Sequence, residues 1–207
     1  MLSTLDTITA SGEYSPGGVM GKLARNNSKP TIGNTVTMGA TVGIAASSVK
    51  AVSEPLLQEF FERLARPTAA EKELIGTDPS GHPDRMPPAE VADRLAMRVR
   101  GRGLSQQQRV SVLNPVHYTF GLAIGVAYVA AARRWPAVTR GLGVLAGLTI
   151  YGSTHASVLP ITRVQEPPWK LPVSAVLWEG TSHAVFGLAL EGFRRVFVSL
   201  AGEAAGS

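Results

Sequence analysis

Four long stretches of this chain of 207 residues carry almost no charged side chains. Asp, Glu, Lys and Arg make up 17% of the sequence, whereas they make up about a quarter of a typical soluble protein. A helix needs about 20 apolar residues to cross the hydrocarbon core of a bilayer, and there it satisfies its own backbone hydrogen bonds. The charge-poor stretches therefore predict an all-α membrane protein, a four-transmembrane-helix bundle.

Polar segments between these stretches divide the chain further. The segment EPLLQEFFERLA, which begins at Glu54, has an apolar stripe, so we expect an amphipathic helical excursion between spans one and two. Pro87 and Pro88 favour the start of another helix in that excursion. We predict a flexible cytoplasmic N-terminal tail at 1–31, a membrane domain at 32–196 and a C-terminal tail at 197–207. Within the membrane domain, the predicted spans are 32–52, 115–132, 138–159 and 173–193, and an extracytoplasmic helical loop occupies 53–113.

Basic residues indicate the orientation of the bundle. The N-terminal tail, the turn RRWPAVTR and the junction FRR are net basic, and in a four-span arrangement they face the same side. Cytoplasmic loops of membrane proteins are enriched in Lys and Arg. We therefore expect a multi-pass protein embedded in the lipid bilayer, with both termini in the cytoplasm.

The composition also excludes several functions. The net charge of +5 does not predict nucleic-acid binding, because the basic residues flank apolar spans instead of forming a patch interleaved with aromatic residues. The chain has no cysteine, which excludes disulfides and thiolate metal sites. It lacks the Gly-x-Ser-x-Gly and His-Glu-x-x-His patterns of hydrolases. We expect no catalytic residues and no enzymatic activity.

Three of the predicted spans carry two glycines four positions apart. Small residues at this spacing give a helix a smooth face, which lets another helix approach closely inside a membrane. We therefore predict helix packing at Gly39, Gly43, Gly121, Gly125, Gly143 and Gly147.

Glu179 and His183 stand four positions apart in the fourth span, so their side chains share one face of the helix. An ionisable residue inside a span is costly, and it is read by default as a hypothesis of a functional site. His117 and His155 fall in the outer half of spans two and three in the predicted orientation. We therefore predict one polar cluster of His117, His155, Glu179 and His183 in the outer half of the bundle.

The chemistry of this cluster stays open at the level of the sequence. Imidazole and carboxylate groups suit a divalent metal ion, and the same groups can relay protons. A haem with two axial histidines is the less natural alternative, because the histidines lie at unequal depths. The side chains could also act as structural links between helices. We predict no cofactor and leave a divalent metal open.

Lys50 and Glu54 form a second pair at four-residue spacing, at the end of span one. In one interpretation the lysine extends to the membrane interface and the carboxylate lies on the surface. In the other, the two side chains form a buried ion pair that faces the bundle.

Several stretches resemble one family, the YagU-like group of small bacterial inner-membrane proteins. They are GIAASSVKAVSEP, PPAEVADRLAMRVRGRGLS, HYTFGLAIGVAY and SHAVFGLALEGFRR, and the similarity covers roughly residues 39–196. The resemblance implies a multi-span protein of the bacterial inner (plasma) membrane and includes Glu179, His183 and Glu191 in the family pattern. It implies no established activity.

Two functions follow as hypotheses. The first is a small integral membrane protein whose polar cluster handles protons or a metal ion in transport or stress homeostasis. The second is a non-catalytic accessory subunit, in which the glycine faces pack against the subunits of a larger membrane complex.

Overall fold

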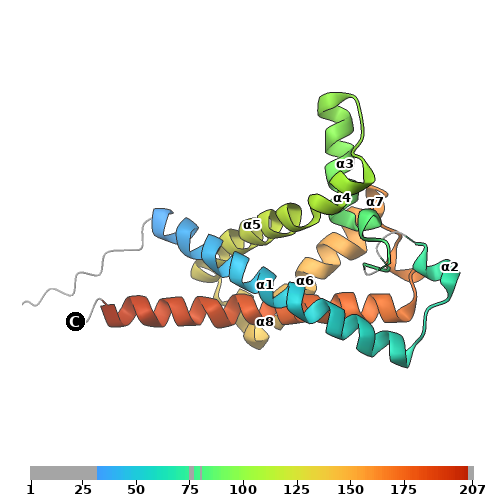
Figure 1. Ribbon diagram of the computed structural model, residues 1–207. Coiled ribbons are helices and arrows are strands. Elements are labelled where there is room, and N and C mark those ends of the chain that lie inside the picture. The colour runs from blue at the N-terminus through green and yellow to red at the C-terminus, as the bar shows by residue number, and fades with distance from the viewer. Residues whose placement is uncertain (1–31, 75–76, 80, 205–207) are drawn as a thin grey trace, which may run out of the picture.

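The computed structural model describes residues 32–74, 77–79 and 81–204, and every regular element within them is a helix. The prediction of an all-α protein is therefore confirmed for this part of the chain. The predicted N-terminal tail, 1–31, lies outside the described residues. The longest helices are α1 (Ile32–Leu64), α5 (Leu113–Arg134) and α8 (Val173–Ala204) (Figure 1). The shorter ones are α2 (Ala69–Lys72), α3 (Pro87–Arg100), α4 (Gln106–Ser111), α6 (Val144–Ser153) and α7 (Leu159–Ile161).

Three helical segments are long and apolar enough to cross a membrane. They are Ile32–Leu64, Gln106–Arg134 and Pro136–Ile161, and they contain the first three predicted spans. The fourth predicted span lies in α8, which does not reach the same apolarity although it has 32 residues, because Glu179, Ser182 and His183 interrupt its apolar sequence. Large apolar side chains are exposed along the three segments, as a bilayer-facing surface requires; examples are Ile44, Phe120, Leu145 and Leu148.

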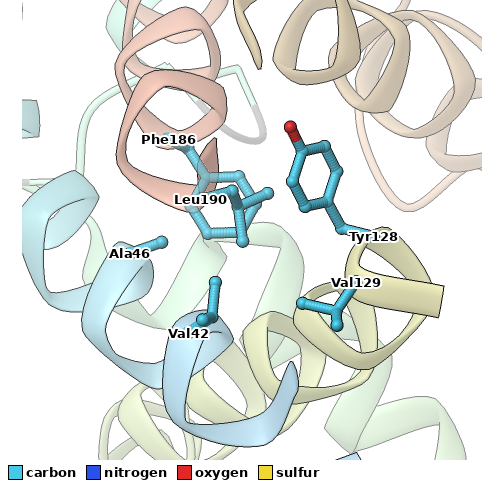
Figure 2. Close-up of a cluster of buried hydrophobic side chains, with 6 residues drawn as sticks. All are labelled: Val42, Ala46, Tyr128, Val129, Phe186 and Leu190. Atoms are coloured by element: carbon cyan, nitrogen blue, oxygen red, sulfur yellow. The ribbon is translucent and has the colours of Figure 1, made fainter. Parts of the chain in front are cut away.

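The apolar core lies where α1, α5 and α8 meet. Figure 2 shows its six buried side chains pointing toward one another, and α8 contributes the two central ones, Phe186 and Leu190. Figure 1 shows α1 and α8 as the two longest helices, running alongside each other in opposite directions. The remaining members of the core are Val42 and Ala46 from α1, and Tyr128 and Val129 from α5.

Two helices extend beyond the predicted spans. α1 continues through Pro55 to Leu64 as one helix and so includes both the predicted first span, 32–52, and the start of the predicted helical excursion. The third span is irregular: it begins with 3₁₀ turns at Pro136–Gly143 (η2) and passes, after α6, into a π-helical segment at Thr154–Val158 (η3). α8 continues to Ala204, beyond the predicted end at residue 193.

The six predicted packing glycines lie at two helix contacts within the chain. A Cβ atom on Gly43 of α1 would lie 2.2 Å from the carbonyl oxygen of Gly121 on α5, and one on Gly125 would lie 2.3 Å from that of Gly39. The backbones therefore touch directly.

The second contact joins the third span to α8. A Cβ atom on Gly147 would lie 2.0 Å from the carbonyl oxygen of His183, and one on Gly143 would lie 2.1 Å from that of Gly187. Gly143 also has a φ of +87°, which places it before α6 in the left-handed region that favours glycine. The sequence analysis did not include Gly187.

The polar connection between α1 and α5 is held against the rest of the chain by arginines. Arg94 of α3 donates to the carbonyl oxygens of Thr162 and Arg163, just after α7. Arg109 of α4 pairs with Glu90 and Asp93 of α3. In Figure 1, α3 and α4 accordingly lie beside α7, at the end of the bundle away from Ile32 and Ala204.

Candidate functional site

A buried ionic network surrounds the carboxylate of Glu179. Glu179 keeps 5% of its surface exposed, His183 4% and Lys50 6%. Lys50 comes from α1, Glu179 and His183 come from α8, and His155 comes from the π-helical segment η3. Charged groups are buried in proteins only when they are paired, and here the pairing joins three separate helical segments.

Three cationic or imidazole groups converge on one oxygen atom. Oε1 of Glu179 lies 3.6 Å from Nζ of Lys50, 3.4 Å from Nε2 of His155 and 3.4 Å from Nδ1 of His183. Nζ of Lys50 also donates to Oε1 of Glu54, one turn further along α1. A single ammonium group is thus shared by two carboxylates.

The hydrogen bonds fix the proton on the ring of His183. Its Nδ1 lies 2.9 Å from the backbone carbonyl oxygen of Glu179, one turn earlier in α8. A carbonyl oxygen only accepts hydrogen bonds, so Nδ1 carries the proton and donates it.

His155 is held differently. Its Nδ1 lies 2.7 Å from Oε1 of the buried Gln165, and as the partner of an amide oxygen Nδ1 is a donor. In a neutral ring the other nitrogen, Nε2, then presents its lone pair to the carboxylate of Glu179. Two lone pairs at 3.4 Å repel each other unless one of the groups gains a proton. The arrangement therefore provides a place for one additional proton between His155 and Glu179.

Aromatic contacts orient both imidazole rings. Tyr151 of α6 stacks on His155 with ring centroids 5.9 Å apart and an angle of 11° between the planes. The ring of His183 lies 5.6 Å from that of Tyr151 and 4.9 Å from that of His155. The three rings form one group, so a shift of either histidine moves its neighbours.

A cavity of about 410 Å³ opens beside this network. Its polar end contains Lys50, Glu54, His155, Glu179 and His183. Its walls are mostly apolar and come from α1, α3, α5, the third span and α8. The apolar lining residues used below are Pro87, Val91, Leu113, Phe120, Ile150 and Phe186.

The structure brings most of the predicted cluster together. His155, Glu179 and His183 are in mutual contact, and the predicted pair Lys50 and Glu54 joins them. His117 lines the same cavity, but its Nε2 faces the carbonyl oxygen of Ser47 at 3.3 Å instead of the carboxylate.

Metal binding was one chemistry left open. One donor atom each from His155, Glu179 and His183 lies within 4.8 Å of the others, which suits a divalent ion. The proton on Nδ1 of His183 leaves Nε2 of the same ring free, which is the usual arrangement of a metal-bound histidine. The ammonium of Lys50 opposes a divalent ion at this place, because the ion would share the carboxylate of Glu179 with a second positive charge.

Sequence reasoning missed two residues of the site and one contact. Gln165 fixes His155 from the loop before α8, and Tyr151 stacks on it from α6. The contact of Lys50 with Glu179 joins residues far apart in the sequence. Only the helical spacing of Tyr151 and His155, which places both on one face, could have indicated a partner.

A second buried carboxylate lies nearer the end of α8. Glu191 keeps 1% of its surface exposed and accepts a hydrogen bond of 2.9 Å from the hydroxyl of Tyr128. Arg194 donates to both of its oxygen atoms at 2.7 and 2.8 Å, and Arg195 donates at 2.6 Å. Neighbouring donors thus meet its whole charge. Glu191 lines neither of the two cavities described, although its partner Tyr128 lines the second.

These features define an all-helical protein with three helices able to cross a membrane and a buried ionic network beside a cavity. Residues 68–192 match the sequence profile of a family of proteins of unknown function (DUF1440), and the chain belongs to that family. The match includes α3 to α7 and most of α8 but leaves out α1. No curated protein and no solved structure matches the chain.

Proposed function

We propose that this protein is an integral membrane protein that takes up and releases protons at the network of Lys50, His155, Glu179 and His183. The observation that carries the proposal is the facing pair of Nε2 of His155 and Oε1 of Glu179, which has room for one more proton. An imidazole group exchanges protons readily near neutral pH. The network lines the cavity, where these groups can exchange a proton.

The proposal includes α8 as a fourth span. Its most polar residues are buried against α1 and the third span, so the surface that α8 would present to lipid is less polar than its sequence. Basic residues stand at the end of α5 and just beyond the buried core of α8, and they then favour cytoplasmic termini; they are Arg133, Arg134, Arg194 and Arg195. The excursion with α3 and α4 would then lie on the extracytoplasmic side. The membrane would be the bacterial inner membrane, as in the YagU-like group.

The experiment is proton flux into liposomes that contain the purified protein. A potassium diffusion potential drives protons, and a trapped pH-sensitive dye reports them. We expect flux with the wild-type protein and its loss with Glu179→Gln, because a neutral amide no longer binds the proton. The matched control is Glu59→Gln on α1, where the carboxylate is exposed and pairs with Arg63. Equal flux in the two variants would refute the proposal.

Metal analysis and an absorbance spectrum of the same preparation test the other chemistries. We expect no stoichiometric divalent ion, because the ammonium of Lys50 already pairs with the carboxylate of Glu179, and no Soret band. If a stoichiometric ion is bound and both His155→Ala and His183→Ala lose it, the result would refute proton exchange and support a metal-binding function.

The accessory-subunit hypothesis stays as an alternative, but the surface that would bind a partner is different from the one predicted. The six glycines that were expected to contact partners face other helices of the same chain. A partner would therefore have to bind the exposed apolar sides of α5 and α6, such as those around Leu122 and Leu145. Co-purification of a stoichiometric membrane protein that survives Glu179→Gln would favour this function.

A further inference from the structure

The cavity beside Glu179 has the form of a ligand site. Its volume of about 410 Å³ falls within the range of roughly 300–1,000 Å³ that small-molecule sites occupy. Its lining includes the ionisable groups named above, and its apolar lining includes Pro87 and Val91 of α3, Leu113 and Phe120 of α5, and Phe186 of α8. A ligand that fits must therefore have both a polar or charged group and apolar surface.

The charges at the polar end select the sign of the ligand. Lys50 supplies one ammonium group, whereas Glu54 and Glu179 supply two carboxylates. When the histidines are neutral, one negative charge has no partner among these groups. An organic anion would add a second unpaired negative charge in a cavity where ions are poorly solvated. An organic cation would instead pair with the negative charge that has no partner.

Glu54 is the carboxylate that a ligand reaches first. Its side chain keeps 27% of its surface exposed, whereas that of Glu179 keeps 6%. Both line the cavity. The aromatic rings of Phe120 and Phe186 also line it, and the faces of aromatic rings attract cations in desolvated sites.

We propose that this cavity binds a lipophilic organic cation, with its charge near Glu54 and Glu179 and its apolar groups against the walls from α3 and α5. The inference deepens the proposed function, because the cation supplies the same single positive charge as the mobile proton. Binding of one then opposes binding of the other. The ionisable groups that surround Glu179 are Lys50 and Glu54 from α1, Tyr151 from α6, His155 from η3 and His183 from α8.

Two probes of the same shape and opposite charge test the sign. Tetraphenylphosphonium is a lipophilic cation, and tetraphenylborate is the matching anion. Equilibrium dialysis against the full-length protein in lipid nanodiscs, with empty nanodiscs subtracted, measures binding of each. We expect saturable binding of the phosphonium and none of the borate. Saturable borate binding of similar affinity, or no saturable phosphonium binding, overturns the inference.

Variants locate the bound cation. We expect Glu54→Gln to weaken phosphonium binding roughly tenfold, as the loss of a partly buried charge partner implies, and Glu59→Gln, on the same helix but outside the cavity, to leave it unchanged. Val91→Trp fills the cavity from α3 without touching the ionic network, and we expect it to abolish binding. Unchanged binding in both Glu54→Gln and Val91→Trp overturns the inference even if Glu179→Gln fails to fold.

The same preparations separate this inference from the proposed function. Proton flux without saturable phosphonium binding would support the proposed proton function and refute the proposed cation site. Phosphonium binding that requires Glu54, in a protein without proton flux, would support the ligand and refute the proton function.

Discussion

The ammonium nitrogen of Lys50 on α1 lies 3.6 Å from Oε1 of Glu179 on α8, and both side chains are almost fully buried. This ion pair joins the first and last long helices of the chain. Removal of one partner leaves the other charge buried and unpaired, which destabilises a protein by about 3–5 kcal/mol.

We therefore expect Lys50→Met to lower the free energy of unfolding by roughly 3–5 kcal/mol, measured by thermal unfolding in detergent. The double variant Lys50→Met/Glu179→Gln should recover part of this loss, because the buried carboxylate is then gone and only that of Glu54, which is partly exposed, lacks its partner. Lys170→Met is the control: its exposed pair with Glu166 contributes little. A double variant no more stable than Lys50→Met would contradict a direct pairing.

The glycines of α8 give a second prediction. A Cβ atom on Gly187 would lie 2.2 Å from the carbonyl oxygen of Gly143, whereas nothing lies within 4 Å of one on Gly192. Gly187→Ala should therefore destabilise the protein by about 1–3 kcal/mol through overpacking. Gly192→Ala should be neutral or stabilise it by up to about 1 kcal/mol, since alanine favours the helix. Equal melting temperatures of the two variants would count against the helix contact.

Much of the arrangement followed from local patterns in the sequence. Apolar length predicted α1, α5 and the third span, and the four-residue spacing of Glu179 and His183 predicted that they share a face. The π-helical segment η3 could not be predicted, because nothing in THASV distinguishes a bond to the fifth residue from one to the fourth. That local widening sets the position of His155.

Contacts between distant segments were the other unpredicted part. Lys50 had two interpretations because its partner on α8 depends on how α1 and α8 pack. The glycines at Gly39 and Gly43 indicated a close helix contact but not which helix makes it. The structure places α5 there.

The hydroxyl of Tyr128 supports the second buried carboxylate, Glu191. We expect Tyr128→Phe to cost roughly 1–2 kcal/mol of stability, because the hydrogen bond goes to a charged group that keeps its two arginines. Tyr118→Phe is a matched control, since its hydroxyl faces only Ser48, at 3.3 Å. Thermal unfolding of both variants checks the prediction, which fails if Tyr118→Phe costs as much.

The stability of the N-terminal cap of α2 should depend on pH. Hydrogen bonds from the backbone and hydroxyl of Thr68 lower the pKa of Glu71 below its ordinary value of 4.5. A lowered pKa in the folded state contributes stability above that ordinary value, and this contribution is lost as the pH falls through the lowered pKa. Amide hydrogen exchange of Ala69–Lys72, corrected for intrinsic rates, should therefore show decreasing protection under acid conditions.

Glu71→Gln is the control for this effect. Glutamine keeps an oxygen that can accept from Thr68, as in other capping boxes, but it has no titratable proton. The variant should protect α2 to an extent that does not change with pH over the same interval. A variant with the same acid dependence as the wild type would assign the effect to another group.

The contact of Arg94 with the residues after α7 can also be tested. Arg94 donates from two nitrogens to the carbonyl oxygens of Thr162 and Arg163, and lysine cannot reproduce this planar fork. We expect Arg94→Lys to increase hydrogen exchange around Leu159–Gln165. Arg98→Lys on the exposed side of the same helix should not. If the two variants exchange alike, the excursion is held by other contacts.

The place of α8 in the chain bears on how the protein is made. Synthesis delivers α1, α5 and the third span first, so Lys50, Tyr128 and the glycine surfaces of the third span exist before Glu179, Glu191 and Gly187 emerge from the ribosome. In the proposed arrangement with α8 as a fourth span, this helix of marginal apolarity settles against partners already in the bilayer instead of entering lipid alone. The earlier helices would then serve as an insertion template for the last one, and a defect in α1 would appear first as a mislocated C-terminus.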